Sequence, residues 1–171
     1  FGKAIGGGVP GAAYGFTKEV ADAIVARQDL EDCDVGGIGG TLAGNALSLA
    51  AMRATLESVL TKDAFDHMIP LAERWTTGAQ EAIEKFNMPW HVSRLGCRAE
   101  YLFSPTAPRN GTEAHHAMDF ELERFMHLFA MNRGILLTPF HNMALMSPAT
   151  TQNHIDYHTQ VFTAALNHLV A

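Results

Sequence analysis

Residues 1–15 read FGKAIGGGVPGAAYG, and this stretch decides how the rest of the chain is interpreted. Lys3 is the third residue of the sequence and is followed by Gly6, Gly7 and Gly8. Three glycines leave no side-chain bulk beside the amine and allow backbone conformations that other residues rarely adopt. A lysine held among glycines and apolar residues is poorly hydrated, which favours attack of its neutral nitrogen on a carbonyl compound. The segment therefore predicts a Schiff-base lysine beside a ligand.

Two other interpretations of the same stretch stay open on the residues alone. Lys3 is also compatible with an ordinary terminal lysine beside a flexible glycine loop. Gly6, Gly8 and Gly11 fit the spacing G-x-G-x-x-G, which would make the chain a non-enzymatic glycine-loop nucleotide-binding module. This match is weak because Pro10 interrupts it and no β-rich run precedes it.

The second informative stretch is residues 39–46, GGTLAGNA, which comes directly before an Ala- and Leu-rich run. That run predicts a largely buried helix over 45–60. Backbone N–H groups and the Thr41 hydroxyl at a helix N-terminus favour a bound phosphate, through hydrogen bonds and the helix dipole. The plainer alternative is that Thr41 or Asn45 only caps the helix.

Together the two stretches resemble the active-site lysine segment and the G-T-x-x-G-N-P segment of class III pyridoxal-phosphate-dependent aminotransferases, whose nearest familiar form is the glutamate-1-semialdehyde aminomutase. The matches follow in the family's order, and residues 134–147, GILLTPFHNMALMS, resemble its last strands more faintly. The resemblance implies the C-terminal part of an α/β, fold-type-I transferase, with the N-terminal part of the same fold missing from this chain. Ala46 stands where the family usually has proline, which affects helix entry more than chemistry.

The resemblance also implies a division of the chain and a set of site residues. Residues 1–62 would be the C-terminal end of the large cofactor-binding domain, and residues 63–171 a small α+β domain. Lys3 would be the catalytic residue and would hold pyridoxal 5'-phosphate as a Schiff base. Gly40 and Thr41 would bind the cofactor phosphate of the neighbouring subunit, so the enzyme would be a homodimer whose active sites are shared between subunits.

The substrate side of the site is less determined. An amino-acid substrate needs a cation for its carboxylate, and Arg98, Arg109 and Arg133 are the candidates in the small domain. Arg133 already has an explanation as a cation at a helix C-terminus. His141 lies in a strand–turn–strand that, by the resemblance, reaches back toward the active site; a turn histidine without a ligand is the alternative. Arg98 and His141 are the predicted substrate residues.

The resemblance implies an enzyme that moves an amino group between an amino acid and a keto acid, a small-molecule transaminase. Residues 138–151, TPFHNMALMSPATT, depart from the aminomutase pattern and favour an aromatic or β-amino acid as substrate. The alternative is an isomerase of the glutamate-1-semialdehyde 2,1-aminomutase type, which returns the amino group to the same carbon skeleton.

Composition and charge argue against several other classes. The formal net charge is −6 with dispersed cations, so no basic stripe is available for a nucleic acid or an anionic membrane, and no apolar run approaches the roughly 18 residues that span a bilayer. Cys33 and Cys97 lack C-x-x-C spacing, so a reducing cytoplasm is the expected location. His154 and His158 lie one turn apart without further ligands, and no metal is predicted.

Periodicity, capping residues and turn residues predict the remaining elements. Helices are expected over 18–28, 45–60, 61–85, 119–132 and 151–170. Strands are expected over 12–16, 90–95, 98–104, 135–140 and 143–146, with loops at the acidic run 29–34 and at 105–112.

Overall fold

The computed structural model describes residues 1–27, 40–139 and 141–171. The chain divides into two compact units, Phe1–Thr61 and Lys62–Ala171. This division lies one residue before the boundary expected from the sequence. The acidic run at 29–34, Cys33 and Gly39 lie outside the described residues.

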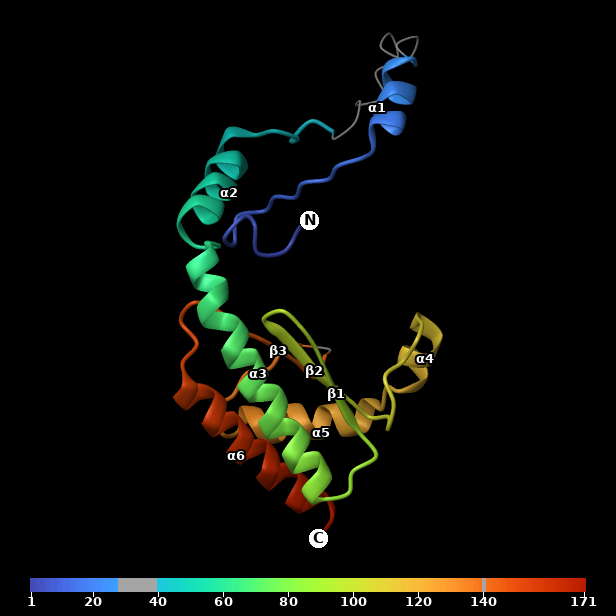
Figure 1. Ribbon diagram of the computed structural model, residues 1–171, viewed down its shortest axis with the longest axis vertical. Helices are drawn as coiled ribbons and strands as arrows, with labels where there is room; N and C mark the ends of the chain where they lie inside the picture. The colour runs from blue at the N-terminus through green and yellow to red at the C-terminus, as the bar shows by residue number, and fades with distance from the viewer. Residues whose placement is uncertain (28–39, 140) are drawn as a thin grey trace. The chain divides into compact units, whose positions relative to one another are not determined.

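The described part of the first unit contains helices α1 (Lys18–Val25) and α2 (Ala46–Ser58), each preceded by an irregular segment (Figure 1). The Thr17 hydroxyl caps α1 by accepting a hydrogen bond from the Val20 N–H, and α1 begins at residue 18, where the helix was expected. The strand expected over 12–16 is wrong, because these residues are exposed and form no strand with any described segment. A short apolar run becomes a strand only where a neighbouring strand completes its hydrogen bonds.

Helix α2 forms where it was expected, but the prediction that it is largely buried is wrong for the described residues. Its cap is Asn45, whose side-chain oxygen accepts a hydrogen bond from the Ser48 N–H at 2.9 Å. Only Ser48 and Thr55 are buried, whereas Leu47 is 70% exposed. The apolar side chains of α2 surround the helix, and within this unit the segment at residues 6–11 covers one side of it.

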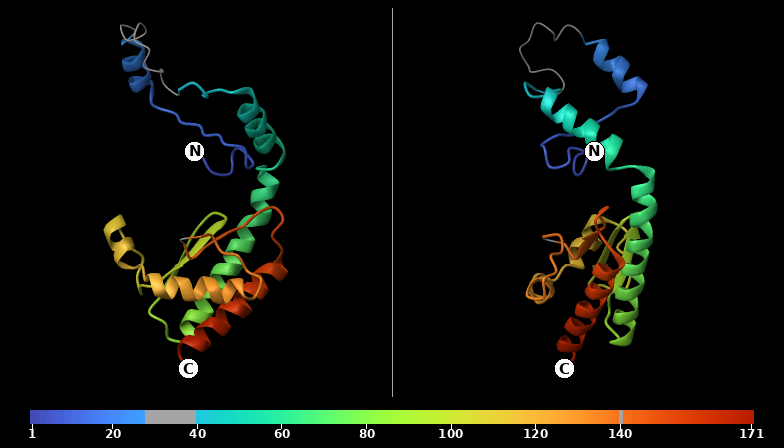
Figure 2. Two further views of the ribbon diagram at one scale, coloured as in Figure 1. Left: turned by 180° about the vertical axis from the view of Figure 1, so that it is seen from behind. Right: turned by 90° about the vertical axis from the view of Figure 1, so that its left-hand side faces the viewer.

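The second unit combines four helices with a three-stranded antiparallel sheet among its described residues (Figure 2). The sheet has the order β1 (His91–Leu95), β2 (Arg98–Leu102), β3 (Met143–Leu145), with Val92 opposite Tyr101 and Arg98 opposite Leu145. The long helix α3 (Lys62–Lys85) packs against α6 (Gln152–Leu169) and against β1 and β2, and α5 (Phe120–Met131) packs against α6.

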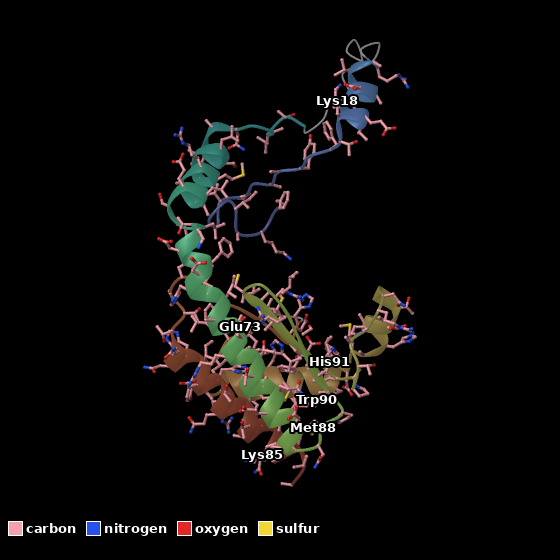
Figure 3. All side chains as sticks on the ribbon, viewed as in Figure 1. Lys18, Glu73, Lys85, Met88, Trp90 and His91 are labelled. Atoms are coloured by element: carbon pink, nitrogen blue, oxygen red, sulfur yellow. The ribbon has the colours of Figure 1, made fainter. Side chains whose placement is uncertain are left out.

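The core of the second unit lies between α3, α6 and the sheet. Trp75, Tyr101, Ile83 and Leu166 are its largest fully buried side chains. At the start of β1, Trp90 joins this core while His91 Nδ1 contacts the Ser104 carbonyl at 2.8 Å (Figure 3). Burial raises the pKa of the Tyr101 hydroxyl, and the negative charge of Glu123 raises it further.

Two further expectations for the second unit need correction. The loop expected over 105–112 is present at 105–110, but residues 111 and 112 begin a short helix, α4 (Gly111–His116), because the Asn110 side chain accepts a hydrogen bond from the Glu113 N–H. The strand expected over 135–140 is absent from the described residues 135–139, where the Thr138 N–H donates to the Met143 carbonyl at 3.3 Å without a continuing ladder. Within the described chain, no helix combines the length and apolar character that a membrane crossing requires.

Candidate active site

Lys3 lies on a loop whose two ends are tied together. The Phe1 nitrogen donates to the Ala13 carbonyl at 2.8 Å, and the Ala13 N–H donates to the Phe1 carbonyl at 2.8 Å. The Lys3 side chain is exposed and forms no hydrogen bond or ion pair with another described residue. The sequence led us to expect a poorly hydrated Lys3 amine, but the described residues leave this amine accessible to water.

The other lysines in the described parts of the chain all have partners. Lys18 pairs with Asp22 at 2.7 Å, and Lys62 pairs with Asp66. Lys85 lies over the ring of its neighbour Phe86, 5.3 Å from the centroid; Lys18 and Lys85 are labelled in Figure 3. Lys3 differs from them in having an amine that no described neighbour engages.

Tight turns follow Lys3, and their backbone requires glycine. The Gly7 N–H donates to the Ala4 carbonyl at 3.1 Å, and the Val9 N–H donates to the Gly6 carbonyl at 3.0 Å. Gly7 has φ +58° and Gly8 has φ +99°, and a Cβ on Gly6 would lie 2.2 Å from the Val9 carbonyl oxygen. This geometry does not fit the G-x-G-x-x-G interpretation, which requires a helix directly after the glycines.

Helix α2 supports the Lys3 loop through its buried face. The Ser48 hydroxyl donates to the Pro10 carbonyl at 2.6 Å. A Cβ on Gly11 would lie 3.5 Å from Met52 Sδ, and a Cβ on Gly7 would lie 2.7 Å from Thr55 Oγ1. The loop and helix border a groove of about 750 Å³, lined by residues 9–14, 42–45, 47–49 and 52. The first unit thus presents an exposed amine on a supported loop, and residues 9–13 of that loop border an open, mostly apolar groove.

Gly40 and Thr41 lie on a separate turn before α2. Gly40 has φ +69°, and its carbonyl accepts a hydrogen bond from the Ala43 N–H at 3.1 Å. Thr41 is exposed and has no hydrogen-bond partner among the described residues, and the helix cap is Asn45 instead. The capping explanation for Thr41 is therefore wrong, and so is its expected position at the helix N-terminus itself.

The two predicted substrate residues come together around an acid that the sequence reasoning missed. Glu100 on β2, with a side chain 12% exposed, forms an ion pair with Arg98 and lies 3.7 Å from His141 Nδ1 through its second carboxylate oxygen. The His141 carbonyl contacts His127 Nε2 at 2.9 Å. The alternation of a strand was the available signal, because it places residues 98 and 100 on one face of β2.

The other two candidate arginines have local partners. Arg109 donates to the Glu113 carboxylate at 2.8 Å on α4, and this guanidinium lowers the pKa of Glu113. Arg133 lies over the Phe129 ring, 3.5 Å from its centroid, and donates to the Phe129 carbonyl at 3.0 Å. Arg133 thereby stabilises the C-terminal end of α5, where a cation is favourable.

Across the described residues, no group of three or more His, Cys, Asp or Glu side chains is placed to hold a metal ion. The two histidines one turn apart on α6 have structural roles. His154 Nδ1 accepts a hydrogen bond from the Thr151 N–H in a capping box, whereas His158 is buried with its ring centroid 5.0 Å from that of Trp75.

No protein-family model matches the sequence. Curated relatives do match: glutamate-1-semialdehyde 2,1-aminomutase of Desulforapulum autotrophicum is 34% identical over 157 residues, covering 91% of this chain and 35% of the relative. Glutamate-1-semialdehyde 2,1-aminomutase 1 of Staphylococcus epidermidis is 32% identical over 172 residues, covering 99% of this chain and 38% of the relative. The chain thus spans little more than a third of the length of these relatives.

Solved structures extend the comparison. A glutamate-1-semialdehyde-aminomutase from Pseudomonas aeruginosa PAO1 superposes with a TM-score of 0.90 at 48% identity, over 98% of this chain and 38% of that chain. An omega-transaminase from Sphaerobacter thermophilus shares the fold, with a TM-score of 0.72 at 23% identity over 99% of this chain and 38% of that chain. The fold and the lysine segment define the C-terminal portion of a fold-type-I, pyridoxal-phosphate-dependent transferase. The chain belongs to the class III aminotransferase family, and the two curated relatives and the Pseudomonas aeruginosa structure described above carry the name glutamate-1-semialdehyde aminomutase.

Proposed function

We propose that this chain carries the catalytic lysine and part of the cofactor site of an enzyme that binds pyridoxal phosphate and moves the amino group of a small amino acid. The observation that carries the proposal is the unengaged amine of Lys3 on a glycine loop supported by α2, in a chain of this family. A small-molecule amino acid, rather than a nucleic acid, is the substrate class that fits this family and the net charge of −6.

The described residues of the first unit fit the two chemical needs of pyridoxal phosphate. The Lys3 amine would hold its aldehyde end covalently. The phosphate of the cofactor in the neighbouring subunit of a homodimer would be bound by Gly40 and Thr41. A Cβ on Gly40 would meet no atom within 4 Å, and the Thr41 hydroxyl has no partner among the described residues. When bound, the cofactor supplies a ring that withdraws the electrons left on the substrate carbon as a proton departs.

Lys3 would have a second role as a free amine. Its Nζ would take the proton from the substrate carbon that bears the amino group and later return one. Gly6, Gly7 and Gly8 assist because they place no side chain beside the moving amine. The residues of the chain thus bind and orient the reactants and transfer the proton.

Arg98 and His141 are proposed as substrate residues. A guanidinium offers a substrate carboxylate two parallel N–H donors. Arg98 is 43% exposed in its side chain, so one face remains accessible although Glu100 engages it. Because Glu100 partly neutralises Arg98, we expect Glu100→Gln to lower the KM for an anionic amino acid, and an unchanged KM would argue against this role for Arg98.

Two reaction types remain, and the comparisons favour one. The curated relatives and the Pseudomonas aeruginosa structure that share 30–48% identity with this chain are named glutamate-1-semialdehyde aminomutase, which supports the isomerase. The transaminase acting on an aromatic or β-amino acid is the second candidate, favoured by the divergent stretch 138–151. Turnover of glutamate-1-semialdehyde without an added amino acceptor supports the isomerase, whereas turnover that requires an external keto acid supports the transaminase.

A homodimer in the cytoplasm completes the proposal. Helix α2 supports the dimer, because Leu49 and Leu56 lie seven residues apart on one face of the helix and are each at least half exposed, so this face needs a cover. Light scattering on the cofactor-loaded protein tests the dimer, and a monomer at micromolar concentration would contradict it.

The decisive variant for the proposed function is Lys3→Ala. We expect it to abolish turnover and the visible absorbance of lysine-bound pyridoxal phosphate. Lys18→Ala is the matched control, since Lys18 pairs with Asp22 on the surface of α1, and it should keep both. Full activity of Lys3→Ala would refute the assignment.

A further inference from the structure

Helix α2 buries two side chains, Ser48 and Thr55, and both carry hydroxyl groups that face the Lys3 loop. A helix face packed only for stability would bury larger apolar groups, which this helix instead leaves exposed. The polar side chains at the contact indicate that hydrogen bonds, which have a defined direction, attach the Lys3 loop to α2. The hydrogen bonds around Ser48 show which segments are attached.

A chain of hydrogen bonds connects the two motif segments through α2. The Asn45 amide nitrogen, Nδ2, donates to the Leu42 carbonyl at 3.0 Å and to the Ser48 hydroxyl oxygen at 3.0 Å. The Ser48 hydroxyl in turn donates its own hydrogen to the Pro10 carbonyl at 2.6 Å. One end of this chain is the Gly40–Ala43 turn that carries Thr41, and the other end is the loop that carries Lys3.

We propose that Asn45 and Ser48 form a bridge that holds the Lys3 loop and the Thr41 turn in one fixed arrangement, with Ser48 as the positioning residue for Lys3. This inference rests on the proposed function, since it assigns a purpose to the support of a catalytic lysine. The direction of the Ser48 hydroxyl is fixed because its oxygen accepts from Asn45 while its hydrogen is donated to Pro10.

Close packing reinforces the bridge. A Cβ on Gly7 would lie 2.7 Å from Thr55 Oγ1, so the loop reaches the helix only because residue 7 has no side chain. Ser48 and Thr55 are each 8% exposed, which shields these contacts from competing water. The loop is therefore held at two points, by a hydrogen bond at Pro10 and by contact at Gly7.

The capping role of Asn45 can be separated from its bridging role. Capping uses the side-chain oxygen, which accepts from the Ser48 N–H at 2.9 Å, whereas bridging uses the nitrogen. Asn45→Asp keeps an acceptor at the cap and places a negative charge at the helix N-terminus, which is favourable. The same substitution removes both hydrogen bonds that Asn45 donates.

The test measures how fast Lys3 is modified by pyridoxal phosphate in the whole protein, by borohydride reduction at successive times and mass spectrometry of the Lys3 peptide. We expect Ser48→Ala and Asn45→Asp to slow the labelling on the order of tenfold, because small misplacements of a reacting group are costly. Ser48→Thr, which keeps the hydroxyl, and Ser58→Ala, on the exposed end of α2, should stay close to the wild-type rate. Equal rates in Ser48→Ala and wild type would overturn the bridge.

A second measurement keeps the bridge testable if the lysine proves unreactive. Peptide-level hydrogen exchange over residues 1–13 should become faster in Ser48→Ala and Asn45→Asp than in Ser58→Ala. Absence of labelling at Lys3 in the wild type refutes the proposed function, whereas unchanged exchange refutes the bridge. The two failures are thereby distinguished.

Discussion

Lowering the pH should destabilise the second unit through His158 on α6. The side chain is 7% exposed, between the rings of Trp75 and Phe162 at centroid distances of 5.0 and 5.9 Å. Burial disfavours the charged imidazolium and lowers the pKa of His158 from 6.5 to about 4. Between these values the unfolded chain binds a proton that the folded chain does not bind. With respect to His158, the free energy of unfolding is therefore highest above pH 6.5, where the side chain is neutral in both states, and it falls as the pH drops to about 4.

The size of the effect follows from the shift. One pKa unit corresponds to about 1.4 kcal/mol, so His158 should remove about 3 kcal/mol from the free energy of unfolding across this range. Trp75 and Trp90 are the tryptophans of the chain, and both lie in the core of the second unit. Their fluorescence during urea unfolding therefore reports this unit, at about pH 7 and about pH 4.

The comparison with variants isolates His158 from other titrating groups. His158→Phe keeps an aromatic ring in the core and should lose about 3 kcal/mol less than the wild type between the two pH values. His115→Gln, at an exposed position of α4, should keep the wild-type pH dependence. If His158→Phe loses as much stability on acidification as the wild type, the reasoning from burial is refuted.

Three further predictions concern packing and the candidate site. Gly78→Ala should lower the free energy of unfolding by about 1–3 kcal/mol through overpacking, because a Cβ there would lie 2.5 Å from Thr159 Oγ1. In thermal melting, the double variant Gly78→Ala/Thr159→Ala should recover most of this lost stability. Trp75→Ala should cost about 3–5 kcal/mol, since the side chain is 1% exposed, and urea unfolding by circular dichroism that finds under about 1 kcal/mol would contradict this. Thr41→Ala should leave the melting temperature unchanged but raise the Kd for pyridoxal phosphate; an unchanged Kd would leave Thr41 as a plain turn residue.

Local signals in the sequence predicted the helices well. The helices expected over 119–132 and 151–170 form, and Asp119 and Thr151 cap them; a cap is a local signal because it depends on atoms three residues away. The turn between β1 and β2 at Gly96, with φ +58°, is equally local. The strand expected over 12–16 failed for the opposite reason, since a strand depends on a partner that its own residues do not specify.

In the candidate site, too, local features were predictable from the sequence and long-range contacts were not. The glycines after Lys3 were predictable because their φ angles and close contacts exclude any side chain. The contact between Glu100 and His141 was not predicted, because it joins β2 to a residue far along the chain, whereas the alternation of β2 could have indicated that Arg98 and Glu100 share a face. The hydrogen bond from Ser48 to Pro10, which crosses 38 residues, likewise has no signature in either segment alone.

The central claim is that the amine of Lys3 holds pyridoxal phosphate. The most direct measurement loads the purified protein with this cofactor, reduces it with borohydride and locates the added mass by peptide mass spectrometry. The account predicts one modified residue, Lys3, with Lys18, Lys62 and Lys85 unmodified. A protein that retains the cofactor while Lys3 stays unmodified, or that is labelled equally at all of these lysines, would contradict it.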